Sequence, residues 1–191
     1  YIDKIVKHAA DFEDMEKALL VKCAQKADDF FKNLRLSLSH SYSSFDSNKA
    51  AFIPWVFAKT DDSKTYEEGL PHTRMGVIFL NSIIIHTQNE QELTKTRIHE
   101  KIHLYQRAYP EDMVAYMAAN RYTIWKNKSA ELFVRSNPDT DSYLYVDETL
   151  KPLFAVYKSQ TPSGINDVAY GSRNQEHPYE VMAYAIAEMC V

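Results

Sequence analysis

The chain has few of the residues on which disulfide-rich and disordered proteins depend. It contains two cysteines, four glycines and seven prolines in 191 residues. Two widely spaced cysteines do not make a disulfide framework, so we expect Cys23 and Cys190 to be buried thiols, with a single bridge as the alternative. The small number of glycines and prolines argues against long disordered segments. A folded globular chain is therefore expected.

An excess of positive charge and a long apolar run are also missing. The formal net charge is −4 and the isoelectric point about 6.0, which argues against a general nucleic-acid binder. No apolar run is long enough for a transmembrane helix or resembles a signal peptide. We therefore expect a soluble protein without nucleic-acid or membrane partners. A signal peptide removed before Tyr1 would leave no trace, so the sequence does not predict the compartment. It does not predict the oligomeric state either.

The most informative stretch is His99-Glu100-Lys101-Ile102-His103, which has the pattern His-Glu-x-x-His. Two histidines four residues apart lie on one face of a helix, since the helix repeats every 3.6 residues. Their imidazoles can then bind one Zn²⁺ at about 2.0–2.1 Å. Glu100 points elsewhere on the helix, where it can serve as the general base for a water that the metal activates.

The flanking residues predict that this motif lies late in a helix that follows a strand. Apolar and β-branched residues at 75–80 and 83–85 predict strand. The stretch Thr87–Glu90 has the form of a capping box, and Pro110 restricts the far end of the helix. We therefore predict a helix from Gln88 to Ala108.

This order of elements and this motif resemble the zincin metallopeptidases. The metzincin branch has a glycine and a third histidine where this chain has Gln106 and Tyr109, so the chain is not expected to be a metzincin. The resemblance implies an α+β fold in which a small mixed or antiparallel sheet borders the active-site helix. It also implies one zinc ion per chain and a peptide or protein substrate. An extended peptide would add to an edge strand of that sheet.

A third zinc ligand must come from elsewhere, and Glu180 is the best candidate. The stretch after Pro178 predicts a helix that is apolar almost all round, and a carboxylate buried there needs a metal or another partner. The pattern resembles the gluzincins, in which a glutamate on a second helix completes the site. A favourable interaction of Glu180 with the helix dipole is the plainer interpretation. His177 and Glu176 are alternative ligands.

The match to the gluzincins has two departures. Glu180 lies far from His103 along the chain, and Tyr184 stands where these enzymes have an aspartate that orients a ligand. A second group is also needed to stabilise the anionic oxygen of the transition state. The candidates share proximity to Glu180 in the sequence. They are Tyr170, Arg173, His177 and Tyr184.

The rest of the chain is expected to form one domain over residues 1–191, with a helical segment at 1–48 packed on a metallopeptidase core at 49–191. Apolar spacing predicts a helix over 2–38, with a break near Asp28. Residues 52–57 are predicted to form a hairpin with 75–80. A helix is predicted from Pro110 to Trp125.

Two short strands, or a strand and a turn of helix, are predicted at 143–146 and 153–157. Taken together, these patterns predict a zinc metallopeptidase that hydrolyses peptide bonds. The alternatives are a catalytically inactive zinc-binding protein of the same fold, or an enzyme that uses the same metal site on a non-peptide substrate.

Overall fold

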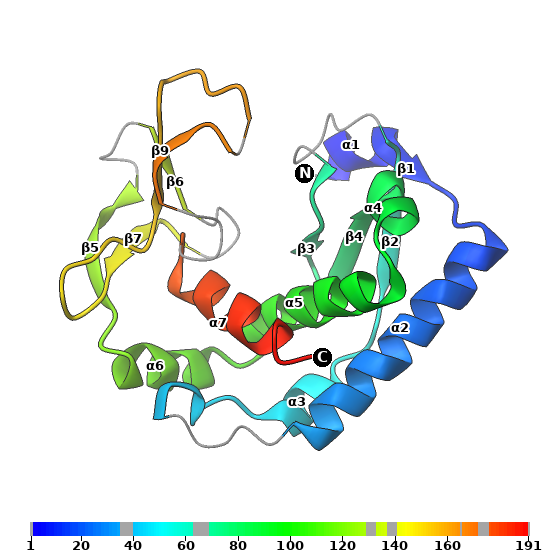
Figure 1. Ribbon diagram of the computed structural model, residues 1–191, viewed down its shortest axis with the longest axis horizontal. Coiled ribbons are helices and arrows are strands. Elements are labelled where there is room, and N and C mark those ends of the chain that lie inside the picture. Colours follow the sequence, from blue (N-terminus) through cyan, green and yellow to red (C-terminus); the bar gives the residue numbers. More distant parts are fainter. Residues whose placement is uncertain are drawn as a thin grey trace. The chain divides into compact units, whose positions relative to one another are not determined.

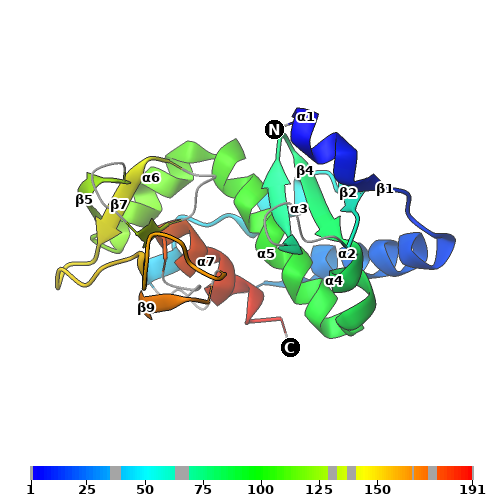
Figure 2. The same ribbon diagram turned by 90° about the horizontal axis from the view of Figure 1, so that it is seen from above.

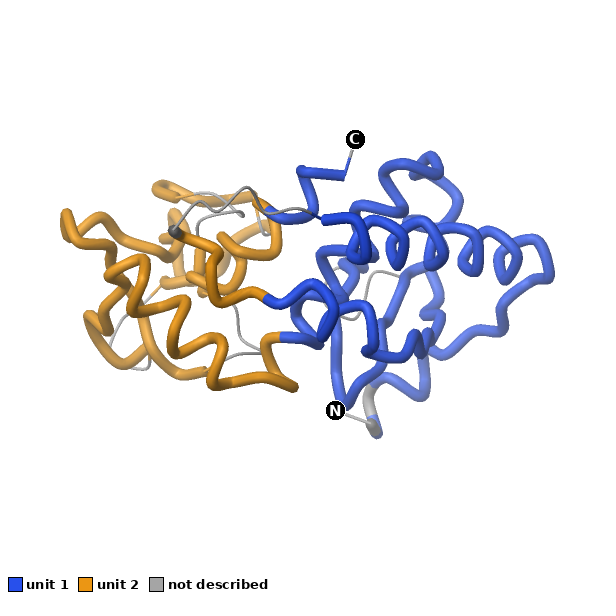
Figure 3. The backbone as a smooth tube through the Cα atoms, turned by 90° about the horizontal axis from the view of Figure 1, so that it is seen from below, with its two compact units in different colours: residues 1–34, 46–105, 186–191 blue, residues 35–45, 106–185 orange. Residues whose placement is uncertain are grey.

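The protein has a mixed α+β fold with small sheets (Figure 1). The structure, a computed structural model, describes residues 2–34, 40–62, 69–128, 133–136, 141–164, 166–171 and 176–190. The chain divides into two compact units (Figure 3). Unit 1 comprises residues 1–34, 46–105 and 186–191, and unit 2 comprises residues 35–45 and 106–185. Each unit thus combines residues from the predicted N-terminal segment with residues from the predicted core.

Unit 1 contains a four-stranded mixed sheet in the order β1-β2-β4-β3 (Figures 1 and 2). The strands are β1 (Ala9–Ala10), β2 (Phe57–Thr60), β3 (His72–Arg74) and β4 (Val77–Asn81). Strands β2 and β4 are parallel, whereas β1 pairs with β2, and β3 with β4, in antiparallel fashion. The β3–β4 turn places Met75 and Gly76 at positive φ, 49° and 80°, as a tight hairpin of this kind requires.

The predicted hairpin between 52–57 and 75–80 is wrong in both its first strand and its direction. Residues 47–52 form α3 (Ser47–Phe52), because the Asp46 side chain accepts hydrogen bonds from the amides of Asn48 and Lys49 at 2.9 and 3.2 Å. Strand β2 therefore begins only at Phe57, and it pairs with β4 in parallel.

The first predicted helix is interrupted near its start rather than near Asp28. The chain forms α1 (Ile2–Ile5), a 3₁₀ turn η1 (Val6–His8), strand β1 and then α2 (Asp14–Asn33). Ala9 and Ala10 pair with β2 in the sheet, which ends the first helical stretch. Helix α2 starts at a capping box formed by Glu13 and Glu16. The predicted apolar spacing holds in α2 from Cys23 onward, where Cys23, Ala27 and Phe31 are buried, but Met15 in its first turn is 80% exposed.

The predicted strand at 83–85 is instead part of helix α4 (Ser82–Thr87). Asn81 caps this helix by accepting a hydrogen bond from the amide of Ile83 at 2.8 Å. Helix α5 (Glu90–Ala108) then follows, close to the predicted bounds. Leu20 of α2, Ile78 and Leu80 of β4, Ile85 of α4 and Leu104 of α5 form one buried cluster. Helices α2, α4 and α5 are thus held to the sheet of unit 1 through this core.

Unit 2 contains η2 (His40–Tyr42), α6 (Pro110–Ala119) and α7 (Pro178–Ala187) up to Ala185, together with two small antiparallel sheets. One sheet pairs β5 (Thr123–Asn127) with β7 (Tyr143–Val146), and the other has the order β6-β8-β9. The strands of the second sheet are β6 (Val134–Arg135), β8 (Ala155–Tyr157) and β9 (Val168–Tyr170). The strand at 143–146 and the helix after Pro178 are confirmed.

The helix predicted from Pro110 to Trp125 ends at Ala119, and β5 begins at Thr123. Arg121 adopts a positive φ of 53°, which breaks the helical path. The strand predicted at 153–157 begins only at Ala155.

Two further sequence predictions concern the cysteines and a membrane segment. Cys23 and Cys190 are both free thiols, with Cys23 buried and Cys190 partly exposed. None of the helices in the described part of the chain has the length and apolar character that a membrane crossing requires.

Candidate metal centre

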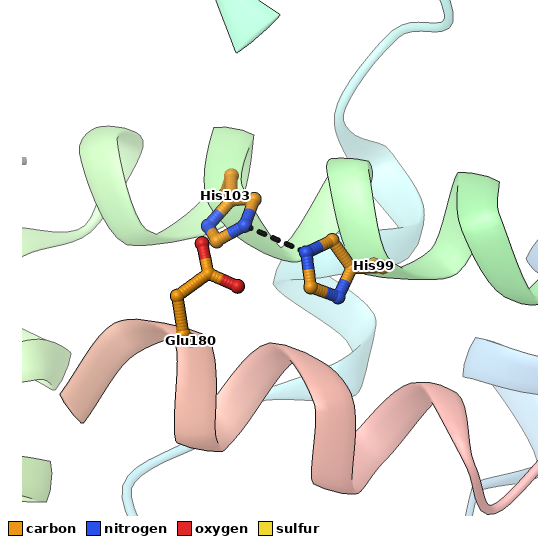
Figure 4. A group of neighbouring side chains, drawn as sticks. All are labelled: His99, His103 and Glu180. Atoms are coloured by element: carbon orange, nitrogen blue, oxygen red, sulfur yellow. Dashed lines mark hydrogen bonds between the residues drawn. The ribbon is translucent and has the colours of Figure 1, made fainter. Parts of the chain in front are cut away.

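His99 and His103 lie on one face of α5, one turn apart, as their spacing predicts. Their Nε2 atoms are 3.0 Å apart and the ring centroids 4.6 Å apart, with the rings nearly perpendicular at 83° (Figure 4). His103 is buried and His99 partly so. The helix therefore presents two imidazole nitrogens to the same small volume.

Glu180, in the first turn of α7, completes the group. Figure 4 shows its carboxylate directed toward the His103 ring. One ligand atom from each of His99, His103 and Glu180 lies within 4.8 Å of the other two, so the three side chains can hold a metal ion. Glu180 is only 7% exposed, as the apolar sequence around it predicts. The structure thus brings together the three residues that the sequence singled out as ligands.

The donor set fits a tetrahedral metal such as zinc. Ligands at about 2.1 Å from a tetrahedral centre lie about 3.4 Å apart, and the two imidazole nitrogens at 3.0 Å are close to that separation. Two nitrogens and one carboxylate oxygen also leave a fourth position for a reactant. To bind the ion, both Nε2 atoms must present lone pairs, so each ring carries its proton on Nδ1 and the His99–His103 hydrogen bond is lost.

Glu100, the predicted general base, is 4% exposed and lies between the two histidines on α5. Gln106, at the metzincin glycine position, has a different part in the fold. Its side-chain amide donates a hydrogen bond to the carbonyl of Tyr179 at 2.9 Å, which holds the first turn of α7.

His177 is fully buried, and both of its ring nitrogens have protein partners. Nδ1 accepts a hydrogen bond from the amide of Tyr179 at 3.1 Å, and Nε2 lies 3.6 Å from Asp141. Burial by itself raises the pKa of Asp141, but hydrogen bonds from His177 and from the Tyr145 hydroxyl outweigh it and lower that pKa. Within the described residues, His177 is outside the metal-holding group, and its contacts fix the start of α7.

The other candidates for a third ligand or a transition-state stabiliser lie in different elements. Tyr184 is on α7 one turn after Glu180, Tyr170 is 48% exposed in β9, and Glu176 forms an ion pair with Arg135. Arg173 lies outside the described residues. The network of Asp141, Tyr145 and His177 was not predicted, since His177 lies far along the chain from Asp141 and Tyr145.

Comparisons with protein-family models, with curated proteins and with solved structures found no match to this chain.

Proposed function

We propose that the chain is a zinc-dependent metallopeptidase with a zincin-like fold. The observation that carries the proposal is the convergence of His99, His103 and Glu180 within 4.8 Å, with Glu100 next to His99 in the sequence of α5. Two imidazoles and one carboxylate with an open fourth position are the ligand set of catalytic zinc sites. A purely structural zinc site is usually closed by four protein ligands, so the ligand count favours catalysis.

The proposed reaction assigns one task to each residue. Zinc, when bound, would lower the pKa of a water molecule toward about 7 and polarise the scissile carbonyl. His99, His103 and Glu180 would hold the ion. The Glu100 carboxylate would accept the proton of the attacking water and deliver it to the leaving amine nitrogen. Tyr184, one turn from Glu180, is the described candidate on α7 for a hydrogen bond to the anionic oxygen.

The edge strand of the unit 1 sheet supports a peptide as substrate. Strand β3 is terminal in the order β1-β2-β4-β3, so its outer edge pairs with no other strand of the described residues. An extended peptide can add to such an edge through main-chain hydrogen bonds. The main chain of the peptide substrate would then be both the part that binds the strand and the part that is cleaved.

The metal analysis of purified protein tests the site. We expect about one zinc per wild-type chain and a large loss of zinc in Glu180→Ala. Glu188→Ala is the matched control, because Glu188 is an exposed glutamate just beyond α7 that pairs with Lys95. Equal zinc content in wild type and Glu180→Ala would move the third ligand elsewhere. Absence of zinc from the wild type would overturn the proposal.

A peptide-library digest read by mass spectrometry tests the reaction. Wild-type protein with zinc should cleave peptides, and chelation should stop the cleavage. Glu100→Gln should keep its zinc and lose at least about 100-fold in rate, because the amide cannot accept the proton. Zinc binding without any cleavage by the wild type would favour the inactive zinc-binding alternative. Full turnover by Glu100→Gln would refute the role of Glu100.

A further inference from the structure

Unit 1 contains a cleft that does not include the metal-holding residues. It has a volume of about 470 Å³ and lies between α2 and the stretch that leads into β2. Leu20, Val21 and Ala24 line one side, and Trp55 and Phe57 line the other. This volume is within the range of small-molecule sites, about 300–1,000 Å³. The lining is mostly apolar, which is also typical of such sites.

The aromatic wall of this cleft is held rigidly. The Trp55 and Phe57 rings are stacked with centroids 5.7 Å apart. The Trp55 indole donates a hydrogen bond to Asp28 at 2.9 Å, and Asp28 also pairs with Lys101 at 2.8 Å. The ammonium of Lys101 lies 3.9 Å from the Trp55 ring centroid. A wall fixed in this way loses little conformational entropy when it binds a flat ligand.

A second cation lies against the same wall and forms no ion pair in the part of the chain that the structure describes. Arg97 is fully buried, and its guanidinium carbon is 5.6 Å from the Phe57 ring centroid. Its Nη1 donates to the carbonyl of Leu93, but Nε and Nη2 have no hydrogen-bond partner within the described residues. Burial lowers the pKa of Arg97 to about 10, so the group stays charged at neutral pH. The wall therefore carries a positive charge at Arg97 for which the described residues show no ion pair.

Lys17 supplies a third cation at the rim. It lines the cleft, its side chain is 60% exposed, and its only described ion pair is with Asp14, which is 99% exposed. An exposed pair of this kind is weak, so Lys17 can turn to another anion at little cost. Asp28, the acidic residue of the lining, is already matched by Lys101.

We propose that this cleft binds a small organic anion, whose flat apolar body lies on Trp55 and Phe57 and whose acidic group pairs with Lys17. The apolar lining accounts for the body, and the positive charges of Lys17 in the lining and of Arg97 behind Phe57 account for the acid. Binding here does not involve the metal-holding residues. The proposal can therefore be tested independently of the peptidase activity.

A pair of fluorescent probes tests the two halves of the proposal. Anilinonaphthalene sulfonate carries an acidic group, and phenylnaphthylamine has the same aromatic body without it. Both should bind wild-type protein, with and without zinc, and the sulfonate should bind more tightly. Ala24→Leu narrows the cleft and should weaken both probes. Unchanged affinity of both probes for folded Ala24→Leu would show that they bind elsewhere and would overturn the proposal.

Two charge variants test the acidic group. Lys17→Gln should weaken the sulfonate about fivefold and leave the neutral probe unchanged. Lys32→Gln is the matched control, because Lys32 is an exposed lysine of the same helix that does not line the cleft. Arg97→Met should also weaken only the sulfonate, and it should fold because it removes a buried unpaired charge. An equal effect of Lys17→Gln and Lys32→Gln, or equal affinity of the two probes for wild type, would refute the anionic half.

Discussion

His99 and His103 differ from the other histidines in what their rings face. His8, His86 and His177 each have a ring nitrogen within 3.6 Å of a carboxylate. His99 and His103 have their Nε2 atoms 3.0 Å from each other, and the Glu180 carboxylate lies within 4.8 Å of both. Two imidazole nitrogens directed at one point are what a shared metal ion needs, because each must donate a lone pair to it. Residue type alone does not distinguish these two histidines, whereas their partners do.

Another buried polar contact at the residue scale is the ion pair of Lys59 and Glu16, whose side chains are 8% and 3% exposed and 2.8 Å apart. Lys59→Met leaves the Glu16 carboxylate buried without its main partner, so we expect the free energy of unfolding to fall by about 3 kcal/mol. Urea denaturation measures it. Lys17→Met, at an exposed pair, should cost under about 0.5 kcal/mol. Equal losses in the two variants would contradict this assignment.

The same carboxylate should make stability depend on pH. Burial tends to raise the pKa of Glu16, but the bonds from Lys59 and from the Glu13 amide outweigh it, so the folded pKa lies below the usual 4.5. The resulting stabilisation is present above the unfolded pKa and is lost as the pH falls through the folded pKa. We expect the melting-temperature gap between wild type and Glu16→Gln to narrow between about pH 7 and about pH 3. A gap that stays constant would rule out this contribution.

At the scale of elements, the start of α5 shows how neighbouring caps compete. Thr87 and Glu90 have the form of a capping box, but the Thr87 hydroxyl donates to the carbonyl of Ile83 within the last turn of α4 instead. Asn89 caps α5: its side chain accepts from the amide of Glu92 at 3.0 Å, and the Glu92 carboxylate accepts from the amide of Asn89 at 2.9 Å. The sequence therefore predicted the helix correctly but not the residue that begins it.

Substitution of these two residues separates their roles. Asn89→Ala should lower the free energy of unfolding by about 1 kcal/mol, because the amide of Glu92 loses its acceptor. Thr87→Ala removes only a hydroxyl bond inside the last turn of α4, and it should cost less than about 0.5 kcal/mol. Chemical denaturation of both variants gives the comparison. A larger loss of unfolding free energy for Thr87→Ala than for Asn89→Ala would instead support Thr87 as the cap of α5, as the sequence predicted.

At the scale of the whole molecule, the metal centre depends on folding. Glu180 and the two histidines come from α7 and α5, which are far apart along the chain. The unfolded chain has no such cluster, so an ion that binds the folded state adds its binding free energy to stability.

Zinc should therefore raise the melting temperature. At a free zinc concentration of 100 times Kd the gain is about 2.7 kcal/mol, and a chain of this size melts about 2–4 °C higher per kcal/mol. We expect a rise of about 5–11 °C in differential scanning calorimetry, and almost none in His103→Ala. His72→Ala should retain the rise, because His72 stacks on Phe79 in the sheet. A rise of the same size in His103→Ala would place the zinc at another site.

Short-range geometry determined what the sequence alone could establish. The helical repeat puts His99 and His103 on one face of α5, and Pro178 starts α7. Tertiary structure decided the rest. Ile83–Ile85 favour strand by residue type, yet they lie in a helix that the Asn81 cap starts and that buries Ile85 in the core.

The pairing of β2 with β4 and the approach of Glu180 to the histidines likewise depend on residues distant in sequence. No local propensity encodes such contacts, because they form only when buried surfaces meet in the folded chain.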